Sequence, residues 1–254
     1  MKGTLYFVML SMLITGCSKH QTPITKRTQM MLLSKSDELK IGDETYKKML
    51  SCTVKCKDTD KIEAINRVGK KLTAQVKNSH IKKWEFVLVE KDTINAACLP
   101  NGKIFINDGV FKVAKNDAQL ATILAHEMSH ALARHGGERI SRNKVINGAG
   151  IGGGVVATLI NPLLLIPYIS LYQSTTNKFV VVPKNILEEK EADEIGLNLM
   201  KKAGYDLNES LVFWENMKNI NKHKGHSHSA THSSYDERIK DLKKVIAKID
   251  KNKS

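Results

Sequence analysis

Two histidines and a glutamate lie close together in the segment His126-Glu127-Met128-Ser129-His130. In a helix, residues four apart lie on one face, one turn from each other, so both imidazoles can reach one metal ion. Glu127 is rotated by about 100° from His126 around the helix axis, where a carboxylate can meet a metal-bound water without ligating the metal. Imidazole ligands with hydrolytic chemistry suit zinc. The alternative is a buried helix with two hydrogen-bonded histidines.

The residues around this segment predict a helix, because apolar side chains recur at helical spacing. They are Leu120, Ile123, Leu124, Met128, Ala131 and Leu132. His135 lies five residues after His130, about 140° around such a helix, and is therefore not expected to bind the same metal. The metzincin pattern is absent, since Ala133 and Gly136 stand where it needs glycine and histidine.

An acidic segment, residues 186–196, can supply a third ligand. Glu189 and Asp193 are four apart and share a helix face. Glu189 can complete a site of two histidines and one glutamate, and Asp193 can accept a hydrogen bond from the second N–H of a ligand histidine. On chemistry alone, three further residues compete with Glu189, namely Glu188, Glu191 and Glu194.

The N-terminus has the pattern of a bacterial lipoprotein signal peptide. A short apolar segment, residues 5–14, is followed by Thr15-Gly16-Cys17, and it is too short to be a membrane-spanning helix. We therefore expect residues 1–16 to be a signal peptide, Cys17 to be lipidated, and residues 17–33, polar and without periodicity, to be a tether. An uncleaved anchor is the alternative. Because Ser18 rather than aspartate follows, the expected location in a Gram-negative cell is the periplasmic face of the outer membrane.

The remaining residues, 34–254, are expected to form a single domain of the α+β class, mainly helical with one small β-sheet. Helices are expected at residues 37–49, 61–76, 186–203, 211–220 and 235–249, and strands at 84–90 and 103–107. Gly204 is expected to end its helix. An apolar, glycine-rich segment, residues 148–172, lies in a stretch without charged residues. A single membrane crossing there would separate the two histidines from Glu189, so we interpret it as a flap over the site or a membrane-contacting insertion.

Several segments together resemble the HtpX and CAAX prenyl protease type 1-like family of gluzincin zinc metallopeptidases, in particular its periplasmic lipoprotein (LoiP-like) branch. The segment Leu124-Ala-His-Glu-Met-Ser-His130 resembles the family's zinc helix, and Glu189-Lys-Glu-Ala-Asp193 is similar to its E-x-E-A-D motif. Residues 36–42 look like its N-terminal helix. Residues 94–109 resemble a strand and turn of the family, with Asn95, Ala96, Pro100 and Gly102 matching. Thr231-His232, with Arg238-Ile239, is similar to its T-H-P…R-I element, although Ser233 replaces the proline.

The resemblance implies a zincin-type fold and a zinc-dependent endopeptidase with one zinc ion on His126, His130 and Glu189. Glu127 would act as general base, and His232 or Arg238 would assist the developing oxyanion. The expected substrates are unfolded or misassembled envelope proteins, as in quality control, and the expected partners include outer-membrane assembly machinery. An extended substrate is expected to pair with the edge of one strand. The residues assigned to it are Asn95, Lys103, Ile104, Phe105 and Ile106.

Three further cysteines, Cys52, Cys56 and Cys98, allow one disulfide in an oxidising compartment. It can join Cys98 to Cys52 or Cys56, or Cys52 to Cys56.

The net charge of +14 comes with scattered lysines and 6% aromatic residues, which excludes nucleic acid as the expected partner. Attraction to anionic lipids is compatible with this positive charge. The membrane contacts expected are the lipid on Cys17 and residues 148–172.

Two other classes of function fit parts of the sequence. One is an envelope lipoprotein chaperone or assembly factor with a latent or structural zinc site, in which His232 would be an occluding fourth ligand. The other is a metal-scavenging lipoprotein that binds through His223, His226, His228 and His232. In that case metal binding would survive the loss of His126 and His130.

Overall fold

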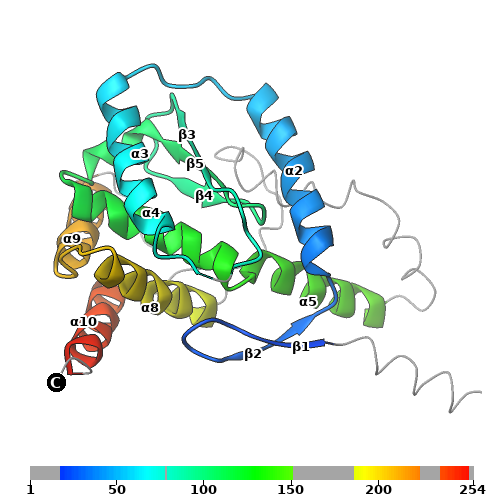
Figure 1. Ribbon diagram of the computed structural model, residues 1–254. Helices are drawn as coiled ribbons and strands as arrows, with labels where there is room; N and C mark the ends of the chain where they lie inside the picture. Colours follow the sequence, from blue (N-terminus) through cyan, green and yellow to red (C-terminus); the bar gives the residue numbers. More distant parts are fainter. Residues whose placement is uncertain (1–17, 78, 151–185, 224–234, 252–254) are drawn as a thin grey trace, which may run out of the picture.

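The computed structural model describes residues 18–77, 79–150, 186–223 and 235–251. Helices enclose a small sheet (Figure 1), which confirms the predicted helical α+β class. The predicted signal peptide, Cys17, His232 and most of the apolar segment, from residue 151 on, lie outside the described residues. Within the described part of the chain, no helix combines the length and the apolar character needed to cross a bilayer.

The central sheet has three strands in the order β3-β5-β4. Strand β3 (Glu85–Val89) runs parallel to β5 (Lys103–Asn107), and β4 (Ala96–Cys98) runs antiparallel to it. Phe86 is opposite Ile104, and Ala97 is opposite Phe105. Ile104, Phe105 and Ile106 are fully buried. Strand β5 therefore lies at the centre of the sheet.

This strand order corrects the assignment of Lys103, Ile104, Phe105 and Ile106 to substrate pairing. Both edges of β5 are already hydrogen-bonded to neighbouring strands, so no backbone groups remain for a substrate. Strand β4, which follows Asn95 directly, is the edge of the sheet on that side. Edge strands keep one row of N–H and C=O groups for another chain.

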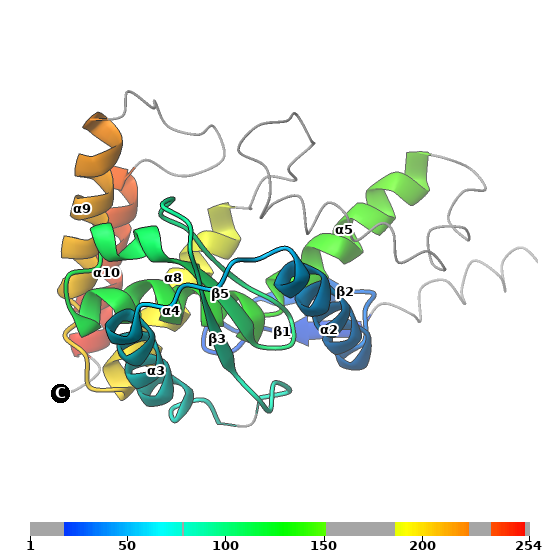
Figure 2. The same ribbon diagram turned by 90° about the horizontal axis from the view of Figure 1, so that it is seen from above.

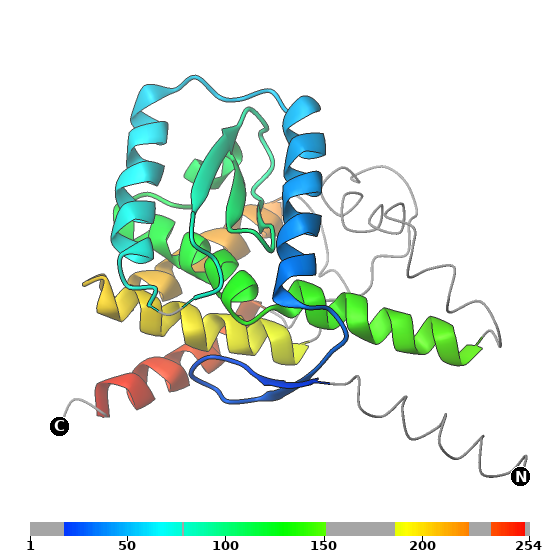
Figure 3. The ribbon, with the colours of Figure 1, turned by 45° about the vertical axis from the view of Figure 1, so that its right-hand side comes forward.

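Helix α4 (Asp117–Leu132) is the buried centre of the molecule. It packs against β4 on one side and against α8 (Ile186–Lys202) on the other, while α2 (Lys35–Ser51) and α3 (Thr59–Thr73) flank the sheet (Figure 3). Helices α9 (Glu209–His223) and α10 (Tyr235–Lys251) pack together at one end, opposite α5 (His135–Gly150) (Figure 2). Strand β5 is followed by a short 3-10 turn, η1 (Asp108–Lys112).

Local signals account for several helix ends. Ser34 and Asp37 form a capping box at the start of α2, and the side chain of Asn116 accepts a hydrogen bond from the backbone of Gln119 at the start of α4. Such caps satisfy backbone N–H groups that have no partner inside the helix. Gly204, which follows Ala203 after the end of α8, has a φ of +76°, the conformation that glycine adopts most easily at a helix end.

Residues 18–31 form an antiparallel hairpin of β1 (Ser18–Gln21) and β2 (Thr28–Met31). The expectation of an unstructured tether over residues 17–33 is therefore not met from Ser18 on. The hairpin lies against α5 (Figure 1), and alternate residues of β2, Gln29 and Met31, are buried. Each strand has only four residues, and one of the two buried residues of β2 is polar, so the periodic signal is too weak to be distinguished from a tether. The hairpin is also a second sheet, beside the one predicted.

Candidate metal centre

Helix α4 brings the two histidines together. Nε2 of His126 lies 3.1 Å from Nε2 of His130, and their rings meet edge to face with centroids 4.7 Å apart. Both side chains are buried, with 7% and 6% of their residue surface exposed. Because α4 is enclosed by the sheet and by α8, both imidazoles face the protein interior rather than solvent.

Helix α8 brings Glu189 to the same point. Its Oε2 lies 3.4 Å from Nε2 of His126, and its Oε1 lies 3.3 Å from Nε2 of His130. Among the described residues, these three side chains form a group whose ligand atoms all lie within 4.8 Å of one another. Two imidazole nitrogens and one carboxylate are the donor set of zinc sites with three protein ligands and an open fourth position. The residues present thus fit a zinc ion.

The other acidic residues of α8 that compete with Glu189 are engaged elsewhere. Glu188 pairs with Arg139 and Arg142, Glu191 with Arg27 and His135, and Glu194 with Lys248. These partners come from α5, the hairpin and α10, which lie on other sides of α8. Of the four carboxylates left open by the sequence, Glu189 is therefore the one that faces the two histidines.

Asp193 and Arg238 lie behind His126. Oδ1 of Asp193 is 2.9 Å from Nδ1 of His126, and the Arg238 guanidinium donates to both Asp193 oxygens, at 2.9 and 2.6 Å. Burial opposes ionisation of Asp193, but the positive charge of Arg238 and the contact with His126 outweigh it and lower its pKa. Asp193 is thus a carboxylate that can accept the Nδ1 proton and leave Nε2 for the metal.

Arg238 is placed as a supporting residue rather than at an open position. Its guanidinium carbon lies 3.7 Å from the centre of the Trp214 ring, and its Nη1 lies 3.6 Å from Oε2 of Glu189. The side chain is 9% exposed and contacts two carboxylates and one histidine of the site. Stabilisation of an oxyanion by Arg238 stays a prediction, as does the same role for His232.

Glu127 projects toward the edge strand β4. Its Oε2 accepts a hydrogen bond of 3.2 Å from the backbone N–H of Cys98, and the residue is 8% exposed. The partner N–H fixes the carboxylate between the two ligand turns of α4 and the open edge of the sheet. The role of Glu127 as general base stays a prediction.

The cysteines lie outside the metal-binding group. Burial, and to a smaller degree the Glu127 carboxylate, raise the pKa of Cys98 well above its usual value, so it is a neutral thiol. Cys52 is exposed and Cys56 half-buried, and no disulfide links the three in the described structure. The disulfide allowed by their number stays a prediction.

His135 is the contact that sequence reasoning missed. It is fully buried, and its Nδ1 lies 2.8 Å from Nδ1 of His130, on the side of the ring away from Glu189. The chain turns between α4 and α5 at Arg134, which has a φ of 57°, so helical spacing does not apply to His135. A third histidine soon after the motif is the signal that could have found it.

Comparisons with known proteins agree with this geometry. The sequence pattern of peptidase family M48 matches residues 60–246, the part that contains all the side chains of the metal-binding group. Mitochondrial metalloendopeptidase OMA1 of Saccharomyces cerevisiae is 30% identical, over 94% of this chain and 74% of its own. The protein of the same name from Schizosaccharomyces pombe is 28% identical, over 88% of this chain and 65% of its own.

Bacterial relatives are longer than this chain. The beta-barrel assembly-enhancing protease of Yersinia pestis is 28% identical over 68% of this chain, which spans 36% of that protein. The protein of the same name from Escherichia coli strain K12 is 25% identical over 73% of this chain, which spans 38% of it.

Proposed function

The chain belongs to peptidase family M48, and from that premise we propose that it is a zinc-dependent endopeptidase of the bacterial cell envelope, which hydrolyses unfolded or misassembled envelope proteins. The observation that carries the proposal is the meeting of His126, His130 and Glu189 at one buried point, with Glu127 beside them. Relatives named as metalloendopeptidases and as an assembly-enhancing protease support the reaction class.

The proposed mechanism gives each side chain one task. His126, His130 and Glu189 would hold the zinc ion, which when bound acidifies a water molecule and polarises the scissile carbonyl. The Cys98 N–H holds Oε2 of Glu127, so we assign proton transfer to Oε1. This oxygen takes the proton of the water and delivers it to the leaving amine nitrogen. Asp193, which Arg238 holds by two hydrogen bonds, keeps His126 in the tautomer that a metal ligand needs.

Substrate binding is assigned to the edge of β4. In the antiparallel pairing of β4 with β5, Asn95 and Leu99 bond toward β5, so the backbone groups of Ala96 and Cys98 point away from β5. The Cys98 N–H there is taken by Glu127, and we assign the pairing with a peptide to Ala96. That edge is next to Glu127. A peptide added there would be recognised mainly through its backbone, as suits unfolded proteins of varied sequence.

The cellular location rests on the N-terminus. The relatives' names refer both to mitochondria and to bacterial β-barrel assembly. The signal peptide pattern ending in Cys17 favours the bacterial envelope, with the enzyme lipid-anchored at the periplasmic face of the outer membrane.

Purified protein tests the reaction directly. We expect the wild type to contain zinc and to degrade an unfolded substrate such as reduced, carboxymethylated protein. Removal of the metal with a chelator should abolish degradation, and added zinc should restore it. The matched control is Glu127→Gln, which should keep zinc and lose activity by about 10²–10⁴-fold, because the general base is gone. Near wild-type activity in zinc-loaded Glu127→Gln protein would contradict the mechanism.

A further inference from the structure

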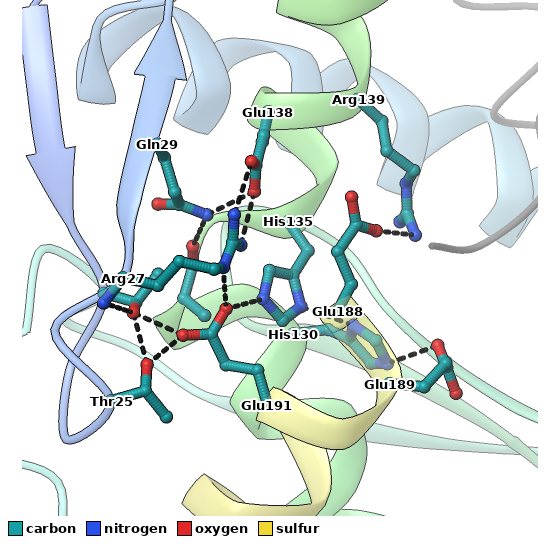
Figure 4. Close-up of polar contacts among 12 residues, drawn as sticks. Thr25, Arg27, Gln29, His130, His135, Glu138, Arg139, Glu188, Glu189 and Glu191 are labelled. Atoms are coloured by element: carbon teal, nitrogen blue, oxygen red, sulfur yellow. Dashed lines mark hydrogen bonds and ion pairs between the residues drawn. The ribbon is translucent and has the colours of Figure 1, made fainter. Parts of the chain in front are cut away.

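A continuous line of buried side chains leads from His130 to the N-terminal hairpin (Figure 4). Nδ1 of His130 lies 2.8 Å from Nδ1 of His135, and Nε2 of His135 lies 3.1 Å from Oε2 of Glu191. His135 is fully buried and Glu191 is 5% exposed. His135 thus connects His130, a residue of the metal-binding group, to the Glu191 carboxylate on α8, which points away from the metal position.

The chemistry of a metal ligand fixes the direction of these hydrogen bonds. Nε2 of His130 faces Glu189 and His126 and must carry a lone pair to bind zinc, so its proton sits on Nδ1. Nδ1 of His135 then has to accept this proton's hydrogen bond, which leaves the His135 proton on Nε2. That proton points at the Glu191 carboxylate, which can only accept. Every proton position along the line is thus consistent with zinc on His130.

The hairpin holds Glu191 at the far end of this line. Arg27 Nε donates to Oε2 at 2.7 Å, and the hydroxyls of Thr22 and Thr25 both donate to Oε1. Arg27 is itself fixed by two bonds of 2.7 Å to Glu138 on α5, as Figure 4 shows. The turn of the hairpin therefore determines where the Glu191 carboxylate lies.

The two ligand histidines are thus supported in different ways. His126 contacts a carboxylate directly, Asp193 of α8, at 2.9 Å. His130 reaches its carboxylate through His135, and that carboxylate depends on residues 22–27. The family match begins at residue 60, so the supporting hairpin lies outside the matched segment.

We propose that the β1–β2 hairpin positions the zinc ligand His130 through Glu191 and His135, so that zinc affinity depends on a segment more than a hundred residues away in sequence. The inference rests on the proposed function, because it assumes that His130 binds zinc. His135 and Glu191 are positioning residues, since they touch neither the metal position nor a substrate. Outer contacts of this kind contribute about 10–100-fold to metal affinity.

The test measures zinc affinity by competition with a chromophoric chelator at neutral pH. All variants are made in full-length protein that carries Glu127→Gln, so hydrolysis does not enter the result. We expect Glu191→Gln to weaken zinc binding by about 10–100-fold, because a neutral amide holds the His135 proton less firmly. Arg27→Met should weaken it by roughly tenfold, since Glu191 then loses its cationic anchor. The visible spectrum of the cobalt(II) form should change in both variants.

The matched control is Thr28→Val, on an exposed position of the same hairpin, which should leave zinc affinity and the cobalt spectrum unchanged. Thermal unfolding of the metal-free proteins identifies a variant that fails to fold. If Glu191→Gln fails to fold, the zinc affinity of Arg27→Met decides whether the proposal holds. Unchanged affinity in folded Glu191→Gln and Arg27→Met proteins overturns the proposal, and a loss in Glu191→Gln alone overturns the role of the hairpin. Failure of the proposed function would appear earlier, as absence of zinc from the Glu127→Gln parent.

Discussion

At the residue scale, distant partners decide which acidic side chain of α8 faces the histidines. Four glutamates within residues 188–194 have the same chemistry, and the sequence alone leaves three of them in competition with Glu189. The structure separates them by their partners: arginines of α5 and the hairpin take Glu188 and Glu191, and Lys248 takes Glu194. None of these partners is close to α8 in sequence, so spacing could not reveal them.

Substitution of two neighbouring glutamates tests this assignment. We expect Glu189→Gln to lose zinc, with a drop in affinity larger than the roughly 10–100-fold caused by losing an outer contact, because only two protein ligands remain. Glu188→Gln should keep zinc and instead lower the melting temperature, since Arg139 and Arg142 lose a charged partner. Zinc content after dialysis and thermal unfolding measure both effects. Zinc retained by Glu189→Gln and lost by Glu188→Gln would show that the register is wrong.

His126, His130 and His135 show how far local spacing reaches. The first two lie within one continuous helix, so a period of 3.6 residues is enough to place them on one face. His135 is beyond the end of α4 at Leu132, where Arg134 adopts a positive φ and redirects the chain. Its ring therefore reaches the outer nitrogen of His130, which no continuation of the helix could have predicted.

At the element scale, the crossing of α4 and α8 determines the distance between the histidines and Glu189. Gly196 lies at this crossing, where a Cβ atom would be 3.3 Å from the backbone of Ala125 and from the nitrogen of His126. A Cβ atom there fits only if the two helices move apart by a few tenths of an ångström. The sequence predicts both helices and Gly204 as the end of α8, but it contains no local signal for this close approach.

Gly196→Val tests the dependence of the site on this approach. Although a residue with a side chain favours helix over glycine, the clash with the Ala125 backbone should dominate and cost about 1–3 kcal/mol. Zinc affinity should fall as well, because Glu189 moves with α8. The control is Lys202→Ala, on an exposed position of the same helix, which should leave both quantities unchanged. An unaltered zinc affinity and melting temperature in Gly196→Val would contradict the role of the crossing.

The order of the strands in the sheet could not be predicted from the sequence, although two of the strands could. Alternating and apolar residues correctly predict strands near β3 and β5, because side-chain pattern is local. Strand order depends on pairing between segments, and β4, with only three residues from Ala96 to Cys98, is too short to give a periodic signal. The sequence therefore predicts the wrong strand as the edge of the sheet.

At the scale of the whole molecule, three distant segments converge beside α4. Helix α8 supplies Glu189 and Asp193, α10 supplies Arg238, and the hairpin supplies Arg27. Many of the contacts are between opposite charges in a protein with a net charge of +14. Buried carboxylates that are paired in this way are costly to leave without their partners, which ties the N-terminal hairpin and the C-terminal helix to the stability of the same centre.

At His80 the surrounding positive charges are unfavourable, because they oppose protonation of the imidazole. Burial lowers the pKa of His80 to about 4, with help from the positive charges of Arg134, Lys35, His20 and Lys82. In the unfolded chain its pKa returns to about 6.5, so between these two values the unfolded state binds more protons than the folded state. The stability contributed by neutral His80 is thus fully present above pH 6.5 and is lost as the pH falls toward 4.

We therefore expect the metal-free wild type to lose more stability than His80→Gln when the pH is lowered from 7 to 5. Because His80 is only half-buried, solvent screens part of the effect, and a difference of about 1 kcal/mol, or 2–4 °C in melting temperature, is the expected size. Thermal unfolding of both proteins at the two pH values measures it, and use of the metal-free form removes the competition between protons and zinc at His126 and His130. Equal losses of stability in the two proteins would show that protonation of His80 does not cause the acid sensitivity.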